Sequence, residues 1–96
     1  MMTEPVILEA LRTPFGRPAG QWAQHRPDSL LAGVLRDVTA SAGVPTEAID
    51  DVICGCVSQA GEQGANIARQ AALLAGLPES VPGVTLNRMC GSSQQA

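Results

Sequence analysis

The sequence predicts an α/β domain built in layers. The apolar run from Val52 to Val57 is nearly unbroken, which is typical of a strand buried on both faces of a parallel sheet. Segments with apolar residues at helical spacing lie on both sides of this run. The order is strand, helix, strand, helix, strand and the start of a further helix, and this alternation indicates a layered α/β fold.

The first two elements are a strand and a long helix. "PVILEALRT" predicts a strand over about Val6–Leu11, and a loop rich in proline and glycine follows it. The helix begins with Asp28 as its N-cap and ends at Gly43, after which Pro45 prevents its continuation. Its core-facing residues repeat at helical spacing: Leu30, Leu31, Val34, Leu35 and Val38.

The remaining elements are shorter. Thr46 is the expected cap of a single helical turn in "PTEAIDD", ahead of the second strand. Asn66 is the expected N-cap of a second helix, which ends before Gly76. "GVTLN", residues 83–87, predicts the third strand, and the small and polar residues from Cys90 onward predict the first turn of a third helix.

Composition and charge exclude several classes of protein. The chain has 96 residues, 45% of them hydrophobic, which is not the composition of a disordered protein. Its net charge is −3 and its six basic residues are scattered arginines, so we expect no nucleic-acid binding. No apolar run is long enough for a membrane span, and the N-terminus does not resemble a signal peptide. A cytoplasmic location is therefore expected.

The three cysteines do not form a recognisable metal motif. Cys54 and Cys56 are in C-x-C spacing, Cys90 is distant, and His25 is the only histidine. A zinc site usually needs four such ligands, so no metal site is predicted, and a reducing compartment disfavours disulfides. Cys54 and Cys56 point to the same side of their strand and are expected to fill a tight packing space.

Cys90 is the candidate catalytic residue. A cysteine at a helix N-terminus lies near unpaired N–H groups and the positive end of the helix dipole, which both favour the thiolate. Gly91 permits close approach of a substrate, and a backbone N–H there can face a developing oxyanion. A small structural residue at a strand–helix junction remains the alternative. A nucleophile also needs a base, and the loop residue His25 has no evident route to Cys90.

The glycine-rich stretch "GEQGAN", residues 61–66, has two interpretations. Because it precedes a helix, it is a candidate anion-binding loop. It lacks the lysine of a P-loop and the full glycine pattern of a dinucleotide-binding loop. A structural turn is the preferred interpretation.

Three collinear segments resemble the N-terminal end of a thiolase. They are "VILEALRTPFGR", "DVICGCVSQAGEQGANIARQAALLAGLP" and "SVPGVTLNRMCGSSQQA". The resemblance implies that Cys90, in the N-R-x-C-G-S segment, is the acyl-accepting nucleophile. Thiolases cleave 3-ketoacyl-CoA with CoA or run the reverse condensation, so the expected substrates are coenzyme A thioesters, with no bound cofactor. The family's second cysteine and histidine belong to later motifs that are not in this chain.

The resemblance also implies a subclass and an incomplete chain. Ile67, Ser93 and Gln94 stand where many biosynthetic members have proline, glycine and leucine, which favours a degradative, β-oxidation-type thiolase. Residues 1–96 are expected to form an incomplete thiolase N-terminal domain, inactive alone, of a parent that forms dimers or tetramers. The alternatives are a non-catalytic remnant or interaction fragment, a biosynthetic acetoacetyl-CoA thiolase, and a small thiol redox or metal protein.

Overall fold

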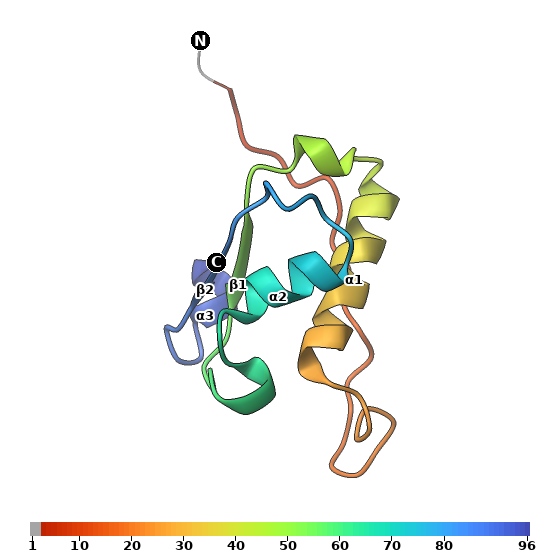
Figure 1. Ribbon diagram of the computed structural model, residues 1–96, viewed down its shortest axis with the longest axis vertical. Coiled ribbons are helices and arrows are strands. Elements are labelled where there is room, and N and C mark those ends of the chain that lie inside the picture. The colour runs from red at the N-terminus through yellow and green to blue at the C-terminus, as the bar shows by residue number, and fades with distance from the viewer. Residues whose placement is uncertain (1–2) are drawn as a thin grey trace.

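The computed structural model describes residues 3–96 and contains a small two-stranded parallel sheet with helices around it (Figure 1). The expected α/β class is confirmed by this arrangement. In chain order the elements are α1 (Pro27–Ala42), η1 (Thr46–Ala48), β1 (Val52–Gly55), η2 (Gly61–Gln63), α2 (Ile67–Leu74), β2 (Gly83–Leu86) and α3 (Ser92–Gln95).

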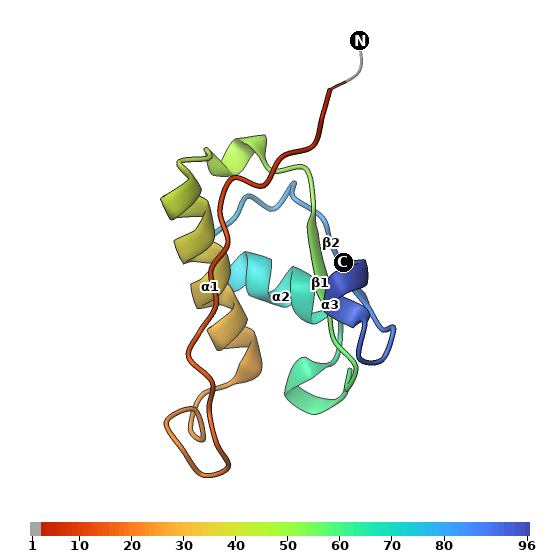
Figure 2. The same ribbon diagram turned by 180° about the vertical axis from the view of Figure 1, so that it is seen from behind.

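The two faces of the sheet are covered by different helices. In the parallel register, Val52 pairs with Gly83 and Gly55 pairs with Leu86. Because side chains alternate along a strand, Val52 and Cys54 share one face and Ile53 and Gly55 the other. The first face packs on α2 and the second carries α3, so these helices lie on opposite sides of β1 (Figures 1 and 2).

The core is small and lies between β1 and α2. Its buried residues are aliphatic and mostly short: Val52, Ala68, Ala72, Leu77 and Val81. The short side chains let α2 lie close to the sheet. A Cβ at Gly83 would lie 2.9 Å from the backbone nitrogen of Arg69, so glycine is required where β2 meets α2.

The boundaries of α1 correct one prediction and confirm another. The N-cap is Arg26 and not Asp28, because Pro27 occupies the first helical position, where its fixed φ is already helical. Asp28 lies inside the first turn and accepts the Ser29 N–H at 2.9 Å. Gly43 ends the helix in the left-handed conformation, with a φ of 69°, as predicted.

The short elements differ from the predictions at their ends. Thr46 lies within η1 and does not cap it, since the N-cap position is Pro45 and no side chain caps this turn. β1 ends at Gly55, two residues before the predicted end at Val57. Asn66 is the N-cap of α2, as expected, and β2 covers four of the five residues predicted for the third strand.

The first predicted strand, Val6–Leu11, is wrong. No backbone hydrogen bond joins these residues to either strand of the described chain, and Val6, Ile7 and Leu8 are 72%, 88% and 66% exposed. The segment is extended and passes along α1, outside the sheet (Figure 2). A strand requires a ladder partner, and within residues 3–96 β1 pairs with β2 alone. Ser41 of α1 donates a 2.6 Å hydrogen bond to Glu9.

Among residues 3–96, no helix combines the length and the hydropathy that crossing a bilayer would require.

Candidate functional site

The candidate site is a turn, residues 87–91, that connects the end of β2 to α3. Cys90 lies in this turn, is exposed and is a free thiol. The helix begins at Ser92 with Gly91 as its N-cap, so the prediction that it starts at Cys90 is wrong by two residues. The reason is local: Gly91 donates its N–H to the carbonyl of Arg88 at 2.9 Å and closes a tight turn first.

The backbone of this turn is strained at Met89. Its φ is 47°, in the left-handed region, which a residue with a Cβ rarely adopts. Met89 directly precedes the cysteine. Such strain persists only where the surroundings hold it in place, and it is frequent at functional sites.

Two polar side chains hold the turn. Ser92, 4% exposed, donates its hydroxyl hydrogen to the carbonyl of Met89 at 2.7 Å and accepts the N–H of Arg88 at 2.8 Å. Asn87 accepts the N–H of Met89 on its Oδ1 at 2.8 Å. Both peptide groups of Met89 are therefore engaged by side chains, which accounts for its conformation.

Gly55 of β1 packs directly against the backbone of α3. A Cβ at this position would lie 2.6 Å from the Cα of Ser93, so any other residue would push the helix off the strand. Sequence reasoning missed this residue. The available signal was a glycine in the middle of an apolar strand, between Cys54 and Cys56, which often marks close backbone approach.

The turn presents a thiol beside an available backbone donor. The amides of Gly91 and Ser92 donate to carbonyls within the turn, at 2.9 and 3.1 Å. The amide of Cys90 donates to no acceptor among residues 3–96. A sulfur nucleophile with a free N–H next to it is the minimal arrangement for attack on a carbonyl, because the N–H can stabilise the oxygen that becomes negative.

The structure does not bring His25 to Cys90. The His25 ring packs edge-on against Trp22, with 5.2 Å between ring centroids. Their loop lies beyond the N-terminal end of α1, whereas residues 87–91 lie beside α3 on the other side of the sheet (Figure 1). Across residues 3–96 there is also no group of three or more His, Cys, Asp or Glu side chains that could hold a metal ion.

Of the two cysteines expected to fill a packing space, Cys54 does so. Cys54 packs against the buried core cluster, as expected, and its burial, together with the nearby Cys56, raises the pKa of its thiol. Cys56, one residue past the end of β1, accepts a hydrogen bond from Gln63 Nε2 at 3.7 Å, which links this residue to η2. Both thiols are partly buried, in contrast to the exposed Cys90.

The N-terminus of α2 is occupied by the chain's own acceptors. The Ala68 N–H donates to Thr85 Oγ1 at 3.0 Å, and the Arg69 N–H donates to Asn66 Oδ1 at 3.4 Å. Thr85 in turn donates to Asn66 Oδ1 at 2.8 Å. Because these amides already have acceptors, the stretch "GEQGAN" behaves as a structural turn, the preferred interpretation.

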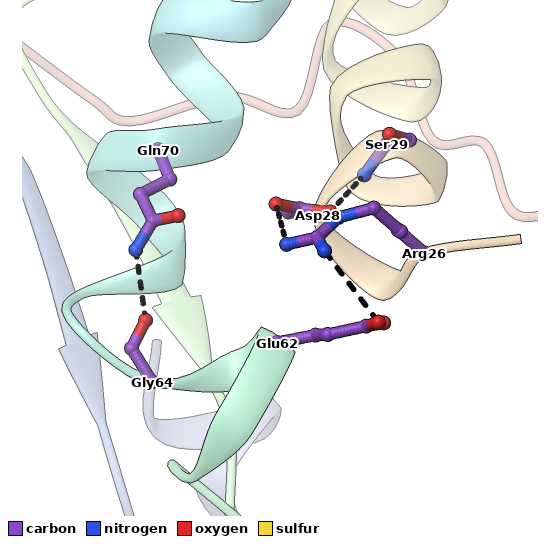
Figure 3. A network of polar contacts seen from close by, with 6 residues as sticks. All are labelled: Arg26, Asp28, Ser29, Glu62, Gly64 and Gln70. Atoms are coloured by element: carbon purple, nitrogen blue, oxygen red, sulfur yellow. Dashed lines mark hydrogen bonds and ion pairs between the residues drawn. The ribbon is translucent and has the colours of Figure 1, made fainter.

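An ion-pair network fixes this turn to α1 (Figure 3). Arg26 makes two 3.1 Å hydrogen bonds to the carboxylate of Asp28 and approaches Glu62 of η2 at 3.5 Å. Hydrogen bonds from Arg26 hold the pKa of Asp28 below its usual range. Nearby, Gln70 donates to the carbonyl of Gly64 at 2.9 Å. The network supports the scaffold and is not joined to the Cys90 turn.

Comparisons of the sequence with known proteins all point to one family. The family described as thiolase, N-terminal domain, matches residues 5–96. The β-ketoadipyl-CoA thiolase of Pseudomonas aeruginosa is 52% identical over 100% of this chain and 24% of its own length. The 3-ketoacyl-CoA thiolase of Colwellia psychrerythraea is 50% identical over 99% of this chain and 25% of its own length. The chain thus spans about a quarter of the length of these relatives.

A solved structure agrees with the fold. The crystal structure of the Bacillus anthracis acetyl-CoA acetyltransferase superposes on 95% of this chain with a TM-score of 0.89, at 40% sequence identity. The match covers 23% of that chain. With a family match that extends over almost the whole sequence, the chain belongs to the thiolase family.

Proposed function

We propose that this chain supplies the nucleophile-bearing part of a degradative thiolase, and that Cys90 is the residue that accepts the acyl group. The observation that carries the proposal is the Cys90 turn, which follows the end of a parallel strand. It holds an exposed thiol beside a backbone N–H, that of Cys90, which has no acceptor among residues 3–96. Polar groups at the carboxyl ends of parallel strands are a frequent place for binding and catalysis.

The chemistry proposed for Cys90 is thiolysis through a thioester. The thiolate attacks the 3-keto carbon of a 3-ketoacyl-CoA, and a bond forms between Sγ and that carbon. The bond between the C2 and C3 carbons then breaks, and its electron pair, with a proton from an acid, leaves as acetyl-CoA. Attack by CoA on the acyl-cysteine releases the shortened acyl-CoA and returns the cysteine thiolate.

The named relatives support a degradative substrate class. The relatives cited above from Pseudomonas and Colwellia are named as β-ketoadipyl-CoA and 3-ketoacyl-CoA thiolases. Ile67, Ser93 and Gln94 favour the same subclass, and β-oxidation of fatty acids or related side chains is the context we propose. The Bacillus structure is named as an acetyl-CoA acetyltransferase, so a biosynthetic acetoacetyl-CoA thiolase is the second candidate.

The proposed activity needs groups that residues 3–96 do not place near Cys90. No acid–base side chain is hydrogen-bonded to Cys90 in the described chain, and His25 packs elsewhere. We therefore propose that residues 1–96 act as an incomplete N-terminal domain of a cytoplasmic enzyme that forms dimers or tetramers. Half-exposed apolar side chains on the sheet, such as Ile53 at 46% and Val84 at 44%, are consistent with cover by further protein.

A chimera tests the proposal. Residues 1–96 replace the matching quarter of the Pseudomonas relative, and CoA-dependent cleavage of a 3-ketoacyl-CoA is followed by loss of substrate absorbance. We expect the chimera to be active and its Cys90→Ser variant to lose at least about a thousandfold in kcat, because a serine hydroxyl is not ionised at neutral pH. Cys56→Ser is the matched control and should retain activity.

The isolated chain provides a second test of the proposal. Without the rest of a thiolase, we expect no CoA-dependent cleavage of acetoacetyl-CoA. A non-catalytic remnant or interaction fragment is the rival interpretation. It predicts that both the isolated chain and the chimera are inactive. An active chimera whose Cys90→Ser variant is equally active would contradict the role of Cys90.

A further inference from the structure

We propose that Ser92 is a positioning residue for Cys90, because it orients the peptide group whose N–H faces the reacting carbonyl. The inference rests on the proposed function of Cys90 as the nucleophile. It concerns the buried hydroxyl of Ser92, whose hydrogen bonds all lie within the turn: to Met89 and Arg88, and at 3.5 Å to Oδ1 of Asn87.

The carbonyl of Met89 and the N–H of Cys90 belong to the same peptide group. This peptide is trans, as are all described peptides, so its C=O and N–H point in opposite directions. The carbonyl of Met89 points toward the buried Ser92 and accepts two hydrogen bonds from it, one from Oγ–H at 2.7 Å and one from N–H at 3.1 Å. Because the carbonyl is held inward, the N–H of Cys90 is directed outward, beside the exposed thiol.

The strain at Met89 makes this restraint necessary. With a φ of 47°, the residue tends to relax to an ordinary backbone conformation, and that relaxation would rotate the peptide between Met89 and Cys90. The Ser92 hydroxyl opposes the rotation at both ends of the turn, since it also accepts the N–H of Arg88 at 2.8 Å. Two donors on one carbonyl also polarise the peptide, which strengthens its N–H as a donor.

The test compares two reactions of the same thiol in the 96-residue chain. In acylation by acetyl-CoA, Sγ attacks the thioester carbon, the bond from that carbon to the CoA sulfur breaks, and CoA leaves as the thiol with the cysteine proton. Its tetrahedral intermediate carries an oxyanion that the Cys90 N–H can stabilise. Alkylation by iodoacetamide displaces iodide and forms no oxyanion. Both rates are measured at Cys90 by peptide mass spectrometry.

We expect the loss of the Ser92 hydroxyl to slow acylation of Cys90 and to leave its alkylation nearly unchanged. Ser92→Ala should lower the rate of acylation by about tenfold and change the rate of alkylation by less than about twofold. Ser92→Thr, which keeps the hydroxyl, should restore acylation. Ser93→Ala is the matched control, because Ser93 is the neighbouring serine, is exposed, and makes no side-chain hydrogen bond to residues 3–96.

Two results would overturn the role of Ser92: an unchanged acylation rate in Ser92→Ala, or an equal loss of acylation and alkylation, which would indicate unfolding of the turn alone. The proposed function itself would be contradicted separately, by a Cys90→Ser chimera as active as the unchanged chimera. A third result would overturn the role of Ser92 alone. If Cys90 of the unchanged chain were acylated no faster than N-acetylcysteine at the same pH, the turn would not activate an acyl acceptor.

Discussion

Gly55 of β1 lies directly against the backbone of Ser93 in α3. A Cβ on Gly55 would lie 2.6 Å from the Cα of Ser93, which is closer than such atoms approach in folded proteins. The contact joins the strand to the helix that follows the Cys90 turn. It therefore sets how far that turn stands from the sheet, and a glycine on β1 controls the position of a residue 35 positions later.

Gly55→Ala should displace α3 and disturb the Cys90 turn. We expect a loss of about 1–3 kcal/mol in the free energy of unfolding, because the added methyl meets backbone that cannot move as a side chain can. In the chimera, kcat should fall as well. Gly33→Ala is the control: a Cβ at Gly33, in the middle of α1, meets nothing within 4 Å. That variant should be stabilised by about 0.5–1 kcal/mol.

Asn66→Ala should destabilise α2. Asn66 caps the helix with its Oδ1, donates to the carbonyl of Gly83 at 2.9 Å, and adopts a left-handed φ of 59° that alanine tolerates poorly. Urea unfolding should show a loss of about 1–2 kcal/mol. Gln24→Ala, at an exposed loop position, provides the comparison and should leave the midpoint unchanged. Equal midpoints for both variants would mean that the cap is not needed.

The ion pair of Arg26 and Asp28 makes the free energy of unfolding depend on pH in the acid range. Hydrogen bonds from Arg26 lower the pKa of Asp28 in the folded chain. A lowered folded pKa gives a contribution that is fully present above the ordinary aspartate pKa of about 3.9 and is lost as pH falls through the folded value.

Asp28→Asn should therefore remove part of this acid dependence. The variant should be less stable than the unchanged chain at neutral pH, and the difference should shrink as pH falls below about 4. Urea unfolding across this range measures it, with Asp50→Asn as an exposed control. A difference that stays constant with pH would show that the carboxylate charge of Asp28 does not contribute.

The three thiols should react in a defined order. Cys90 is exposed, whereas burial raises the pKa of Cys54 and leaves less reactive thiolate. In the folded chain at pH about 8, iodoacetamide should label Cys90 first and Cys54 last. In concentrated urea the difference should disappear. Rapid labelling of Cys54 and Cys56 in the folded chain would contradict the partial burial of these two thiols.

The sequence predicted correctly those elements that depend on residues close together in the chain. The helix α1, the C-terminal Gly43 and the N-cap Asn66 depend on neighbours within a few residues, and all three were predicted correctly. The predicted core face of α1 is confirmed only at Leu35, which packs against the core cluster, whereas the other four residues of that face are half-buried. Asp28 was not the N-cap because Pro27 begins the helix, two residues earlier than a cap at Asp28 would allow. The strand at Val6–Leu11 failed because strand pairing depends on a partner that no local pattern identifies.

The candidate site was predicted only in outline. The sequence identified Cys90 through its position before a helix and through the family resemblance. It did not reveal the left-handed Met89, the hydrogen bonds of the Ser92 hydroxyl within the turn or the contact of Gly55 with α3. Each of these depends on the way the turn folds back on itself or on packing between distant segments.

The central claim is that the sulfur of Cys90 carries the acyl group. The most direct measurement is peptide mass spectrometry of the chimera, quenched in acid after a 3-ketoacyl-CoA is added without CoA, so that the reaction stops at the acyl-enzyme. The account predicts an acyl adduct on the peptide that contains Cys90, and none in the Cys90→Ser variant. An active chimera that accumulates its acyl adduct on another cysteine, with Cys90 unmodified, would contradict it.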